Sequence, residues 1–432
     1  MSTSLVWFKN DLRVQDQHSL HNAVASGNRV IAFYCFDPLL FGEGLFGFKK
    51  TEKYRAQFLI ETITELKKSL EILNIDLLLY YDNESDVIPK VVQKYNVTDI
   101  YLQKEWTQEE AIIITSVRKK IPTITWHETY DQFLFHPDDI PYEDVSKIPN
   151  VFTVFRKECE KKATVRALLE PIQPLSATNR IENNTEIPTL QELGLDTFTI
   201  DARSAFPYKG GELQAKERIK HYFWETQKLA FYKKTRNGLV GVDYSSKLSP
   251  WLANGSISAR QIYWEVKKFE KEIRKNEDTY WLIFELIWRD YFKYISLKYG
   301  NAIFKIGGIL NKDYDWNSNK AALKQWIEGK TPYDFVNANM IELRETGWMS
   351  NRGRQNVASY WAKELKQDWR IGAAYFESIL IDYDVHSNWC NWMYNAGVGN
   401  DPRDRIFNIK SQAERYDTQG KFRKLWLQNQ LF

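Results

Sequence analysis

The chain changes its repeating pattern near residue 135, and this change limits the folds open to it. Before that point, short runs rich in β-branched and aromatic residues alternate with helical segments, whereas after about residue 210 only helical patterns remain. Strand–helix alternation is typical of a parallel sheet with helices on both faces, and a run of amphipathic helices is typical of an all-α domain. We therefore expect two domains of different class, which fits a length of 432 residues.

The patterns predict individual elements in both halves. The expected strands of the first half cover residues 4–8, 29–36, 76–81, 98–103 and 124–128, and its clearest helices cover 53–73 and 108–120. The expected helices of the second half cover residues 211–232, 258–275, 279–299, 320–328, 333–346, 351–367 and 371–382. Because the turn after the first strand, KNDLRVQD, contains no glycine, a dinucleotide bound through a GxGxxG turn is disfavoured.

Between the two halves the composition is that of a connector. Residues 136–208 are rich in Pro, Asn, Thr and Ser, which indicates a long segment running over the surface. The expected organisation is therefore an α/β domain over 1–135, a connector over 136–208 and a helical domain over 209–432.

Bulk composition excludes several classes of protein. The three cysteines, Cys35, Cys159 and Cys390, lie far apart without a CxxC motif, so a disulfide framework, a zinc module and a four-cysteine iron–sulfur cluster are not expected. The first residues contain no apolar core of signal-peptide length, and no window reaches transmembrane length. We therefore expect a cytoplasmic protein. A net charge of +3 means that a nucleic-acid partner would need a local basic face.

Tryptophan is distributed unevenly along the chain. Of its 16 tryptophans, twelve follow residue 250 and three lie in the first 200 residues. Bulky cores explain part of this content. The asymmetry nevertheless indicates that the two halves do different work.

Two segments at the start of the helical half combine polar and aromatic residues. In residues 245–250, SSKLSP offers hydroxyls, backbone N–H groups and a cation, which suit a phosphate, although serine before proline is also an ordinary helix cap. On the expected helix 279–299, Glu285, Trp288 and Arg289 share one face with Phe292. Either these charges form an internal ion pair, or the face is a wall that hydrogen-bonds and stacks on a flat guest.

A third segment, residues 346–372, contains the turn SNRGRQN between apolar flanks. A solvated loop would not explain Trp348, Met349, Tyr360 and Trp361 on either side of it. Arginines interleaved with aromatic rings are what unpaired nucleic-acid bases and their phosphates require.

The fourth segment, IDYDVHSNWCNWMYNAGVGNDPRDR (381–405), admits three interpretations: a metal site, a thiol site or a wall around an aromatic guest. Asp382, Asp384, His386 and Cys390 mix hard and soft ligands in a set that no common metal prefers. No reactive-cysteine signature surrounds Cys390. We therefore expect no metal and favour the wall.

Taken together, the four segments resemble the photolyase/cryptochrome family over nearly the whole chain. The resemblance is carried by YKKTRNG (232–238), SSKLSPWLA (245–253), FELIWRDYF (284–292), TGWMSNRGRQNVASY (346–360) and DYDVHSNWCNWMYNAGVGNDPR (382–403). Gln355 and the sequence NWCNW at 388–392 point to the cryptochrome DASH branch. The implied fold is an α/β domain of the photolyase type followed by an all-α FAD-binding domain.

The resemblance implies a non-covalent FAD inside the helical domain. The residues implied to meet its phosphates and ribityl chain are Tyr232, Ser245, Ser246, Lys247, Leu248 and Ser249. Those implied to line the isoalloxazine and adenine are Arg289, Asp382 and Asp384, with Arg354 pairing Asp382 and Asn388 facing flavin N5. The implied electron relay runs from Trp392 through Trp369 to Trp316 at the surface.

The implied activity is light-driven repair of cyclobutane pyrimidine dimers by electron transfer from photoexcited reduced FAD, with the lesion extruded or met in single strands. Glu285 would hydrogen-bond the dimer, Trp288 and Tyr394 would stack on it, and Gln355 would lie at the pocket floor. The implied DNA contacts are Asn351, Arg352 and Arg403. A tyrosine at 394, where double-strand photolyases usually carry tryptophan, implies a preference for single-stranded DNA.

The same resemblance leaves a second cofactor and a second function open. A folate antenna (methenyltetrahydrofolate) between the domains is implied, with Glu105 as its candidate contact. The alternative function is that of a blue-light photoreceptor with weak or no repair. Receptors often carry a long tail, whereas this chain ends about thirty residues after GVGNDPR, which favours the enzyme. We expect a monomer. Binding of nucleic acid without chemistry would leave Glu285 and Asn388 unexplained.

Overall fold

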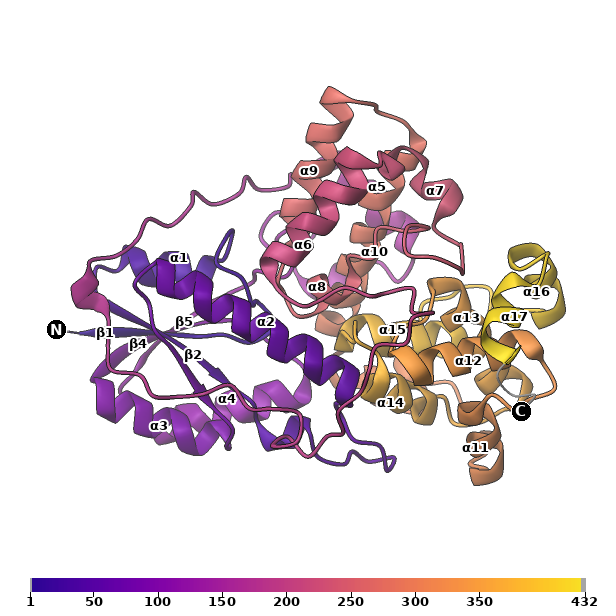
Figure 1. The fold of residues 1–432 in the computed structure, drawn as a ribbon, viewed down its shortest axis with the longest axis horizontal. Coiled ribbons are helices and arrows are strands. Elements are labelled where there is room, and N and C mark those ends of the chain that lie inside the picture. Colours follow the sequence, from indigo (N-terminus) through magenta and orange to yellow (C-terminus); the bar gives the residue numbers. More distant parts are fainter. Residues whose placement is uncertain (1, 429–432) are drawn as a thin grey trace.

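The first half of the chain forms one five-stranded parallel sheet in a computed structural model that describes residues 2–428 (Figure 1). Its strands are β1 (Thr3–Trp7), β2 (Arg29–Cys35), β3 (Leu77–Tyr80), β4 (Val97–Gln103) and β5 (Thr125–Thr129), in the order β3-β2-β1-β4-β5. Each pair is parallel, with Leu5 opposite Ile31 on one side of β1 and Ile100 on the other. The predicted α/β class is therefore confirmed.

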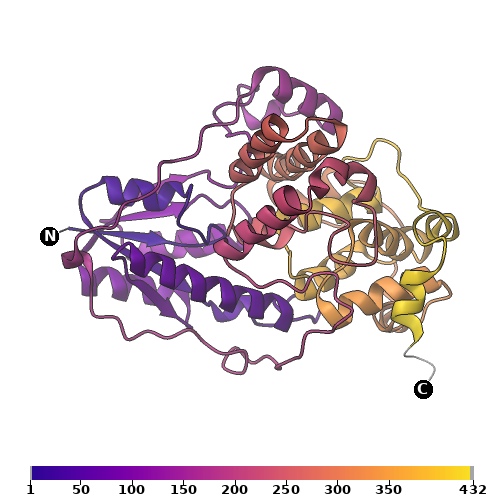
Figure 2. The same cartoon turned by 45° about the horizontal axis from the view of Figure 1, so that its top comes forward.

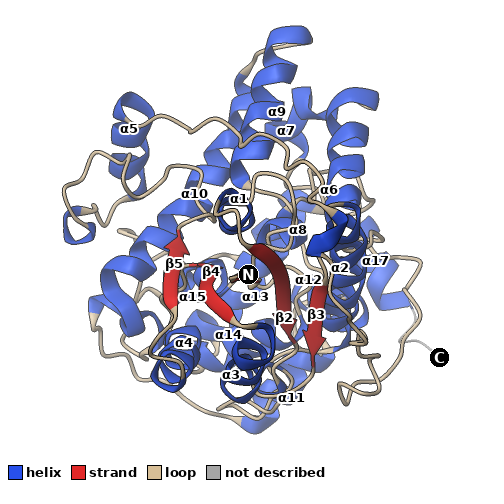
Figure 3. Cartoon of the chain, turned by 90° about the vertical axis from the view of Figure 1, so that its left-hand side faces the viewer, coloured by secondary structure: helices blue, strands red, loops and turns tan. Residues whose placement is uncertain are grey.

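Helices cover both faces of this sheet, as Figure 3 shows. Val6 of β1 points into a core shared with α1 (His18–Ala25) and α2 (Lys53–Ile72), while its neighbour Leu5 points into a core shared with α3 (Glu84–Tyr95) and α4 (Gln108–Lys120). Side chains alternate across a strand, so a sheet buried on both faces needs apolar residues at every position. This requirement explains the continuous apolar sequences of β1 and β2.

The second half is built from helices packed around one aromatic core (Figure 2). Its helices are α6 (Glu212–Ile219), α7 (Tyr232–Thr235), α8 (Ser249–Ala253), α9 (Ala259–Glu272), α10 (Glu277–Tyr299), α11 (Lys320–Glu328), α12 (Asp334–Thr346), α13 (Asn351–Ser359), α14 (Trp369–Ile379), α15 (Val385–Ala396), α16 (Ile409–Tyr416) and α17 (Lys421–Leu427). The largest of them, α10, carries buried residues along its whole length. None of the helices in residues 2–428 is long and apolar enough to span a membrane.

Two of the predicted helices are interrupted. The helix expected over 211–232 ends as a π-helical turn at Glu225, and Gln227 then adopts a left-handed φ of +50°. The helix expected over 351–367 likewise changes to a π-helical turn from Tyr360 to Glu364. Amphipathic periodicity continued across both breaks, so it could not reveal them, and π-helical turns of this kind often lie near functional sites.

The segment 136–208 contains a helix that the Pro- and Asn-rich pattern did not indicate. This helix, α5 (Phe152–Lys162), places Phe152 and Phe155 in the core of the helical half. The chain then returns along the outer strand β3, where Asn183 donates to Leu77 O at 2.8 Å and Thr185 accepts from Leu79 N at 2.9 Å. This return covers a sheet edge that would otherwise expose unpaired backbone groups.

The two halves meet at a cluster of buried charges. Asp131 accepts from Arg13 at 2.5 Å and from Arg260 of α9 at 3.0 Å, and Arg260 also pairs with Asp16 at 2.9 Å. Beside the cluster, Gly255 has a φ of +74°, and a Cβ there would lie 2.1 Å from Asn10 O. Glycine is therefore required for this close approach, and the charge cluster fixes the orientation of one domain on the other.

Candidate functional site

Of the predicted phosphate-binding residues, Tyr232 begins α7 and is buried, whereas the other five lie in and just after one loop of the helical domain, in which Ser246, Lys247 and Leu248 are buried. Ser245 to Leu248 lead into α8, and the side chain of Ser249, its first residue, donates to Asp382 at 2.7 Å. The same carboxylate accepts from Arg354 of α13 at 2.9 Å. Segments more than a hundred residues apart in the sequence therefore meet at one carboxylate.

Lys247 provides a direct test of whether this loop suits an anionic cofactor. Its side chain is 2% exposed, and its ammonium group lies 3.3 Å from the ring centroid of Tyr244 and 4.5 Å from that of Trp348. No residue among 2–428 accepts a hydrogen bond from it. Burial lowers the pKa of Lys247 well below its usual value, while Glu342 opposes the shift. A diphosphate would supply the anion that a buried cation needs, so the loop fits FAD.

Two further predicted cofactor residues make firm contacts with the protein. Asp384 caps the N-terminus of α15 and accepts from Lys293 of α10 at 2.8 Å. Although burial acts to raise it, the charges of Lys293, His386 and Arg289 hold the pKa of Asp384 well below its usual range. Arg289 itself donates to Gln132 O at 2.6 Å and to Leu252 O at 3.0 Å. The carboxyl of Asp384 therefore stays ionised inside the protein, while burial lowers the pKa of its partner Lys293 and Asp384 opposes that shift.

Asn388 and Trp392 lie one turn apart on α15, against α14. Asn388 donates to Ala373 O at 3.0 Å, and the ring of Trp392 packs on Gly372, where a Cβ would lie only 2.3 Å from the indole. Both side chains are buried, at 8% and 2% exposure. Gly372 and Trp369 lie one helical turn apart on α14. The indole of Trp392 therefore packs on the turn that follows Trp369.

The other two predicted relay residues lead outward from this point. Trp369 is fully buried and donates to Ile306 O at 2.9 Å, whereas Trp316 is partly exposed. Asn317, next to Trp316, pairs by backbone hydrogen bonds with Lys366 at 2.7 Å and with Asp368 at 2.8 Å. Trp392 and Trp369 are therefore buried, and Trp316 lies nearer the surface, next to a segment that pairs with the residues just before α14.

The predicted lesion contacts gather around α10. Glu285 pairs with Arg236 at 2.9 Å, and Trp288, one turn further along, meets Tyr394 edge to face at a centroid distance of 6.2 Å. Burial raises the pKa of Glu285, and Arg236 opposes that shift. One face of Trp288 is stacked on Phe152 at 3.6 Å, and the indole is only partly buried, so part of its ring stays accessible to a guest.

The predicted DNA contacts divide into two groups. Arg352 of α13 donates to Gln355 at 2.8 Å and to Asn237 at 3.2 Å, and its guanidinium lies 4.5 Å from the ring of Tyr416. Asn351, at the start of α13, is exposed beside it. Arg403, in contrast, lies in the exposed stretch 402–405. The first group is part of a fixed network, and Arg403 is a free-standing surface cation.

The two residues that first suggested a metal or thiol site have structural roles. His386 is stacked on Trp106 at 4.6 Å, and its Nδ1 lies 2.7 Å from the hydroxyl of Ser296. Burial lowers the pKa of His386 and raises that of the Cys390 thiol. Residues 2–428 contain no group of three or more potential ligands placed to hold a metal ion.

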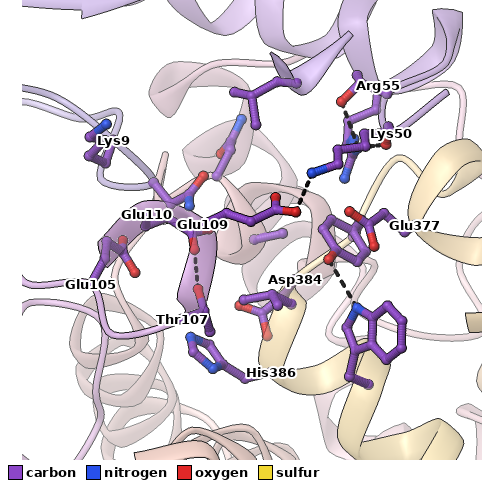
Figure 4. A pocket seen from close by; sticks show the side chains of 18 of the residues that line it. Lys9, Lys50, Arg55, Glu105, Thr107, Glu109, Glu110, Glu377, Asp384 and His386 are labelled. Carbon is purple, nitrogen blue, oxygen red and sulfur yellow. Dashed lines mark hydrogen bonds and ion pairs between the residues drawn. The ribbon is translucent and has the colours of Figure 1, made fainter. Parts of the chain in front are cut away.

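The predicted antenna contact, Glu105, lines a cavity of about 610 Å³ between the two domains, hereafter the interdomain cavity (Figure 4). Its wall is formed by the carboxyl ends of β1, β2 and β4 on one side and by α10, α14 and α15 on the other. The charged side chains in this wall include Lys9, Lys50, Arg55, Glu105, Glu109, Glu110, Arg289, Lys293, Glu377 and Asp384. This is the point where the strand order reverses, at which open α/β sheets bind ligands.

Several residues of these sites were missed from the sequence. Lys293 and Arg236 supply the charge partners of Asp384 and Glu285. Arg55 lies over the ring of Tyr383 at 4.5 Å in the interdomain cavity, near the buried carboxyl of Glu377. Arg236 lies in the quoted sequence YKKTRNG, which could have indicated it. No local signal distinguishes the others, because their partners are distant in sequence.

Comparisons with known proteins agree with this architecture. A sequence model described as the FAD binding domain of DNA photolyase matches residues 281–430, and one described as DNA photolyase matches residues 4–176. Cryptochrome DASH from Gloeobacter violaceus is 44% identical over 432 residues, covering 98% of this chain and 85% of the relative. Cryptochrome DASH from Synechocystis sp. is 45% identical over 432 residues, covering 98% and 87%.

Solved structures extend the comparison to the whole fold. The crystal structure of a Synechocystis sp. cryptochrome aligns with a TM-score of 0.94 at 43% identity, covering 99% of this chain and 89% of that one. A bacterial class III photolyase from Agrobacterium tumefaciens aligns with a TM-score of 0.82 at 24% identity, covering 99% and 87%, and shows the shared fold alone. The helical domain is an FAD-binding domain, and FAD is its cofactor. The chain belongs to the photolyase/cryptochrome family, in its cryptochrome DASH branch.

Proposed function

We propose that this protein uses light to split cyclobutane pyrimidine dimers, with single-stranded DNA as its preferred substrate. The observation that carries the proposal is the grouping of an acid and two aromatic rings around α10. Glu285, Trp288 and Tyr394 come together from α10 and α15, and α15 also carries Asn388 and Trp392. A flat, hydrogen-bonding lesion requires rings on which to stack and an acid to orient it.

FAD, when bound, supplies light absorption and the transfer of a single electron. The protein's own residues orient, hold and shield the substrate. The partly buried carboxyl of Glu285, with its raised pKa, is placed to hydrogen-bond the pyrimidine, and Arg236 fixes its position at 2.9 Å. Asn388, held on Ala373 O, is the proposed neighbour of flavin N5. The proposed electron entry route runs from the partly exposed Trp316 through the buried Trp369 to the buried Trp392.

The preference for single strands is argued from the stacking surface. A base in a duplex must be unstacked before it can enter a pocket, which requires a few kcal/mol. Tyr394 offers a smaller ring than tryptophan, and Phe152 already occupies one face of Trp288. The aromatic area left for stacking is sufficient to bind a lesion that is already unpaired. It offers less energy to extract a lesion from a duplex.

We further propose that the interdomain cavity binds a folate antenna. Glu105 is buried in its wall, and burial, aided by the nearby carboxylate of Glu110, raises the pKa of Glu105 to about 8. The carboxyl is therefore protonated at neutral pH and can donate to a ring nitrogen or a carbonyl, as recognition of a pterin requires. Lys50 and Arg55 on the opposite wall are suited to carboxylates of the same ligand.

All groups of the proposed lesion and flavin sites come from one chain, so we propose that the protein works as a monomer. Its three cysteines are buried and free, which fits the reducing cytoplasm that we propose as its location.

The deciding experiment is illumination of the reduced holoprotein with oligonucleotides that carry one pyrimidine dimer, in single-stranded and duplex form. We expect dimer loss in both forms, faster in the single strand. Glu285→Gln should slow repair by about 10- to 100-fold without loss of FAD, because the amide cannot keep the charged pair with Arg236. Glu277→Gln, an exposed change in the first turn of the same helix, is the matched control.

Two outcomes would contradict the proposal. If neither substrate is repaired while the bound FAD is still photoreduced, the photoreceptor alternative replaces it. If duplex and single strand are repaired at the same rate, the preference for single-stranded DNA is wrong although the lyase activity stands.

A further inference from the structure

Arg218 of α6 is a buried arginine that none of the sequence motifs includes. Its side chain is 2% exposed, yet its five N–H groups face five oxygen acceptors. Three of these are main-chain carbonyls of the loop that precedes α8: Ser246 O and Ser245 O at 2.9 Å, and Val242 O at 3.3 Å. A planar guanidinium that donates to three carbonyls of one loop, and is itself held by two other oxygens, fixes that loop in a single conformation.

The other two acceptors fix the arginine itself. Arg218 donates to Asp243 at 2.7 Å and to the hydroxyl of Tyr208 at 2.8 Å. Asp243 also accepts from Lys228 at 2.9 Å, and although burial opposes it, these two cations hold the pKa of Asp243 well below its usual range. The guanidinium is further flanked by the ring of Tyr222, with the carbon 4.9 Å from the centroid. With its charge paired and its donors used, Arg218 has none left for a ligand.

The loop that Arg218 holds is strained at one position. Lys247 has a φ of +62°, in the left-handed region that a residue with a Cβ seldom adopts. The carbonyls of the two residues immediately before it, Ser245 and Ser246, are those that Arg218 binds. Strained backbone persists only where its surroundings impose it, and here Arg218 is the surrounding group.

We propose that Arg218 is a positioning residue for FAD, which holds residues 242–248 in the conformation that presents Ser246, Lys247 and Ser249 to the cofactor. A loop ordered before binding loses little conformational entropy when the ligand arrives, so affinity rises without a direct contact. The proposal depends on FAD binding in the helical domain and does not depend on repair of DNA.

The test measures FAD affinity of the full-length apoprotein in the dark, together with its thermal unfolding without FAD. Arg218→Met should raise the FAD dissociation constant by about tenfold or more, because the loop then samples other conformations. Arg218→Lys should give an intermediate value, since an ammonium group keeps the charge on Asp243 but cannot bind several carbonyls at once.

Arg260→Met is the matched control. Arg260 is equally buried, at 2% exposure, and is also ion-paired, but it contacts Asp16 and Asp131 at the domain interface. We expect this control to lower the unfolding temperature while FAD affinity stays within about twofold. If both arginine variants lose affinity in proportion to their loss of stability, Arg218 has only a structural role and the proposal fails. It also fails if Arg218→Met binds FAD as the parent does.

A double-mutant cycle tests the route through Lys247. Glycine adopts a positive φ without strain, so in a Lys247→Gly background the loop needs less restraint. Lys247→Gly alone should weaken FAD binding because a cation is lost. The additional effect of Arg218→Met should then be at least about threefold smaller than in the parent. An equal additional effect in both backgrounds would show that Arg218 does not act on the backbone at Lys247.

Discussion

Two pairs of acids in the protein are buried in opposite ways: Asp382 and Asp384, the predicted FAD contacts, are ion-paired, whereas Glu105 and Glu377 in the wall of the interdomain cavity are not, within the described part of the chain. Asp382 pairs with Arg354 at 2.9 Å, and Asp384 pairs with Lys293 at 2.8 Å. In the cavity, Glu105 accepts from the neutral Gln103, and burial raises its pKa to about 8; burial also raises the pKa of Glu377. Neither of these glutamates has an ion-pair partner within 4 Å in residues 2–428.

This difference indicates two kinds of binding site in one molecule. The predicted FAD contacts Asp382 and Asp384 lie in the helical domain, and partners on packed helices satisfy their charges, so the fold fixes their geometry. Asp384 and its partner Lys293 also line the interdomain cavity. The interdomain cavity lies where two domains meet, and it keeps buried carboxyls without counter-ions at a cost in stability. Four predictions test this contrast, in order of decreasing effect.

The largest effect is expected on electron transfer to FAD, because all three proposed relay tryptophans lie in the helical domain. Trp392→Phe should slow photoreduction of bound FAD by about 100-fold, because phenylalanine is much harder to oxidise than indole. The bleaching of the oxidised flavin absorbance under blue light measures this rate. Trp326→Phe is the control, because Trp326 lies 6.2 Å from Trp392 outside the proposed relay. An equal loss in the control would remove the relay assignment.

Asp382→Asn should be the next most severe change. The amide leaves the partly buried cation of Arg354 without its counter-ion, which destabilises the holoprotein by about 3 kcal/mol and lowers FAD occupancy. Denaturant unfolding and the ratio of flavin to protein absorbance measure the two effects. Asp201→Asn breaks a partly exposed ion pair with Arg203. It should change the free energy of unfolding by less than about 0.5 kcal/mol and leave FAD occupancy unchanged. Full FAD occupancy in Asp382→Asn would show that the ion pair between Asp382 and Arg354 is not needed to hold FAD.

Asp131 tests whether the cavity depends on domain docking. Against the effect of burial, Arg13, His18 and Arg260 lower the pKa of Asp131 from 3.8 to about 2. A carboxylate with a depressed pKa contributes stability that is present above pH ~4 and lost as the pH falls toward 2. Its contribution is about 2 kcal/mol, and Asp131→Asn should remove both the stability and this acid step.

Acid unfolding followed by near-ultraviolet circular dichroism measures the step. The same variant should lose affinity for methenyltetrahydrofolate while it keeps FAD. If Asp131→Asn releases both ligands equally, the two sites are not independent and the contrast is wrong.

The smallest effect should have the opposite sign. Glu105→Gln removes a carboxyl whose folded pKa, about 8, lies above its unfolded value of 4.5. Between those values the folded state binds the extra proton, so the parent loses stability as pH rises, whereas the glutamine variant does not. The variant should therefore be more stable, by at least about 1 kcal/mol at pH 8 and by less at pH 5. The pKa difference alone corresponds to about 4 kcal/mol at pH 8, and the partial exposure of Glu105 reduces it. Unfolding temperatures at the two pH values measure this difference, and a destabilised variant at pH 8 would refute it.

The local sequence predicted most elements because their periodicity and the burial they experience agree. The strands β1 and β2 are continuous apolar runs, and each lies inside the sheet. The helix α11 begins and ends at the expected residues, since Asn319 caps its start and Gly329, with a φ of +67°, ends it. The helix α5 was missed because its surroundings in the sequence are rich in turn-forming residues, and packing of Phe152 and Phe155 on α10 helps to stabilise it.

The site residues divide in the same way. Glu285 and Trp288 are one helical turn apart, so their common face follows from the sequence alone. Their partners Arg236, Tyr394 and Phe152 come from three other segments, and no local pattern specifies such contacts. The resemblance to the family identified the motif residues, including Tyr394 and the pairing of Arg354 with Asp382, whereas Arg236, Lys293 and Phe152 were found as partners only in the structure.

The sequence by itself determined the fold class, the family and the cofactor. It did so because helix and strand periods are local properties and because the motif residues lie close together in the chain. Only the tertiary structure decided which buried acids gain a counter-ion, where the interdomain cavity opens and which arginine holds the loop before α8. The physical reason is that electrostatic pairing and close packing act over a few ångströms in space, between residues that the sequence can place 290 positions apart.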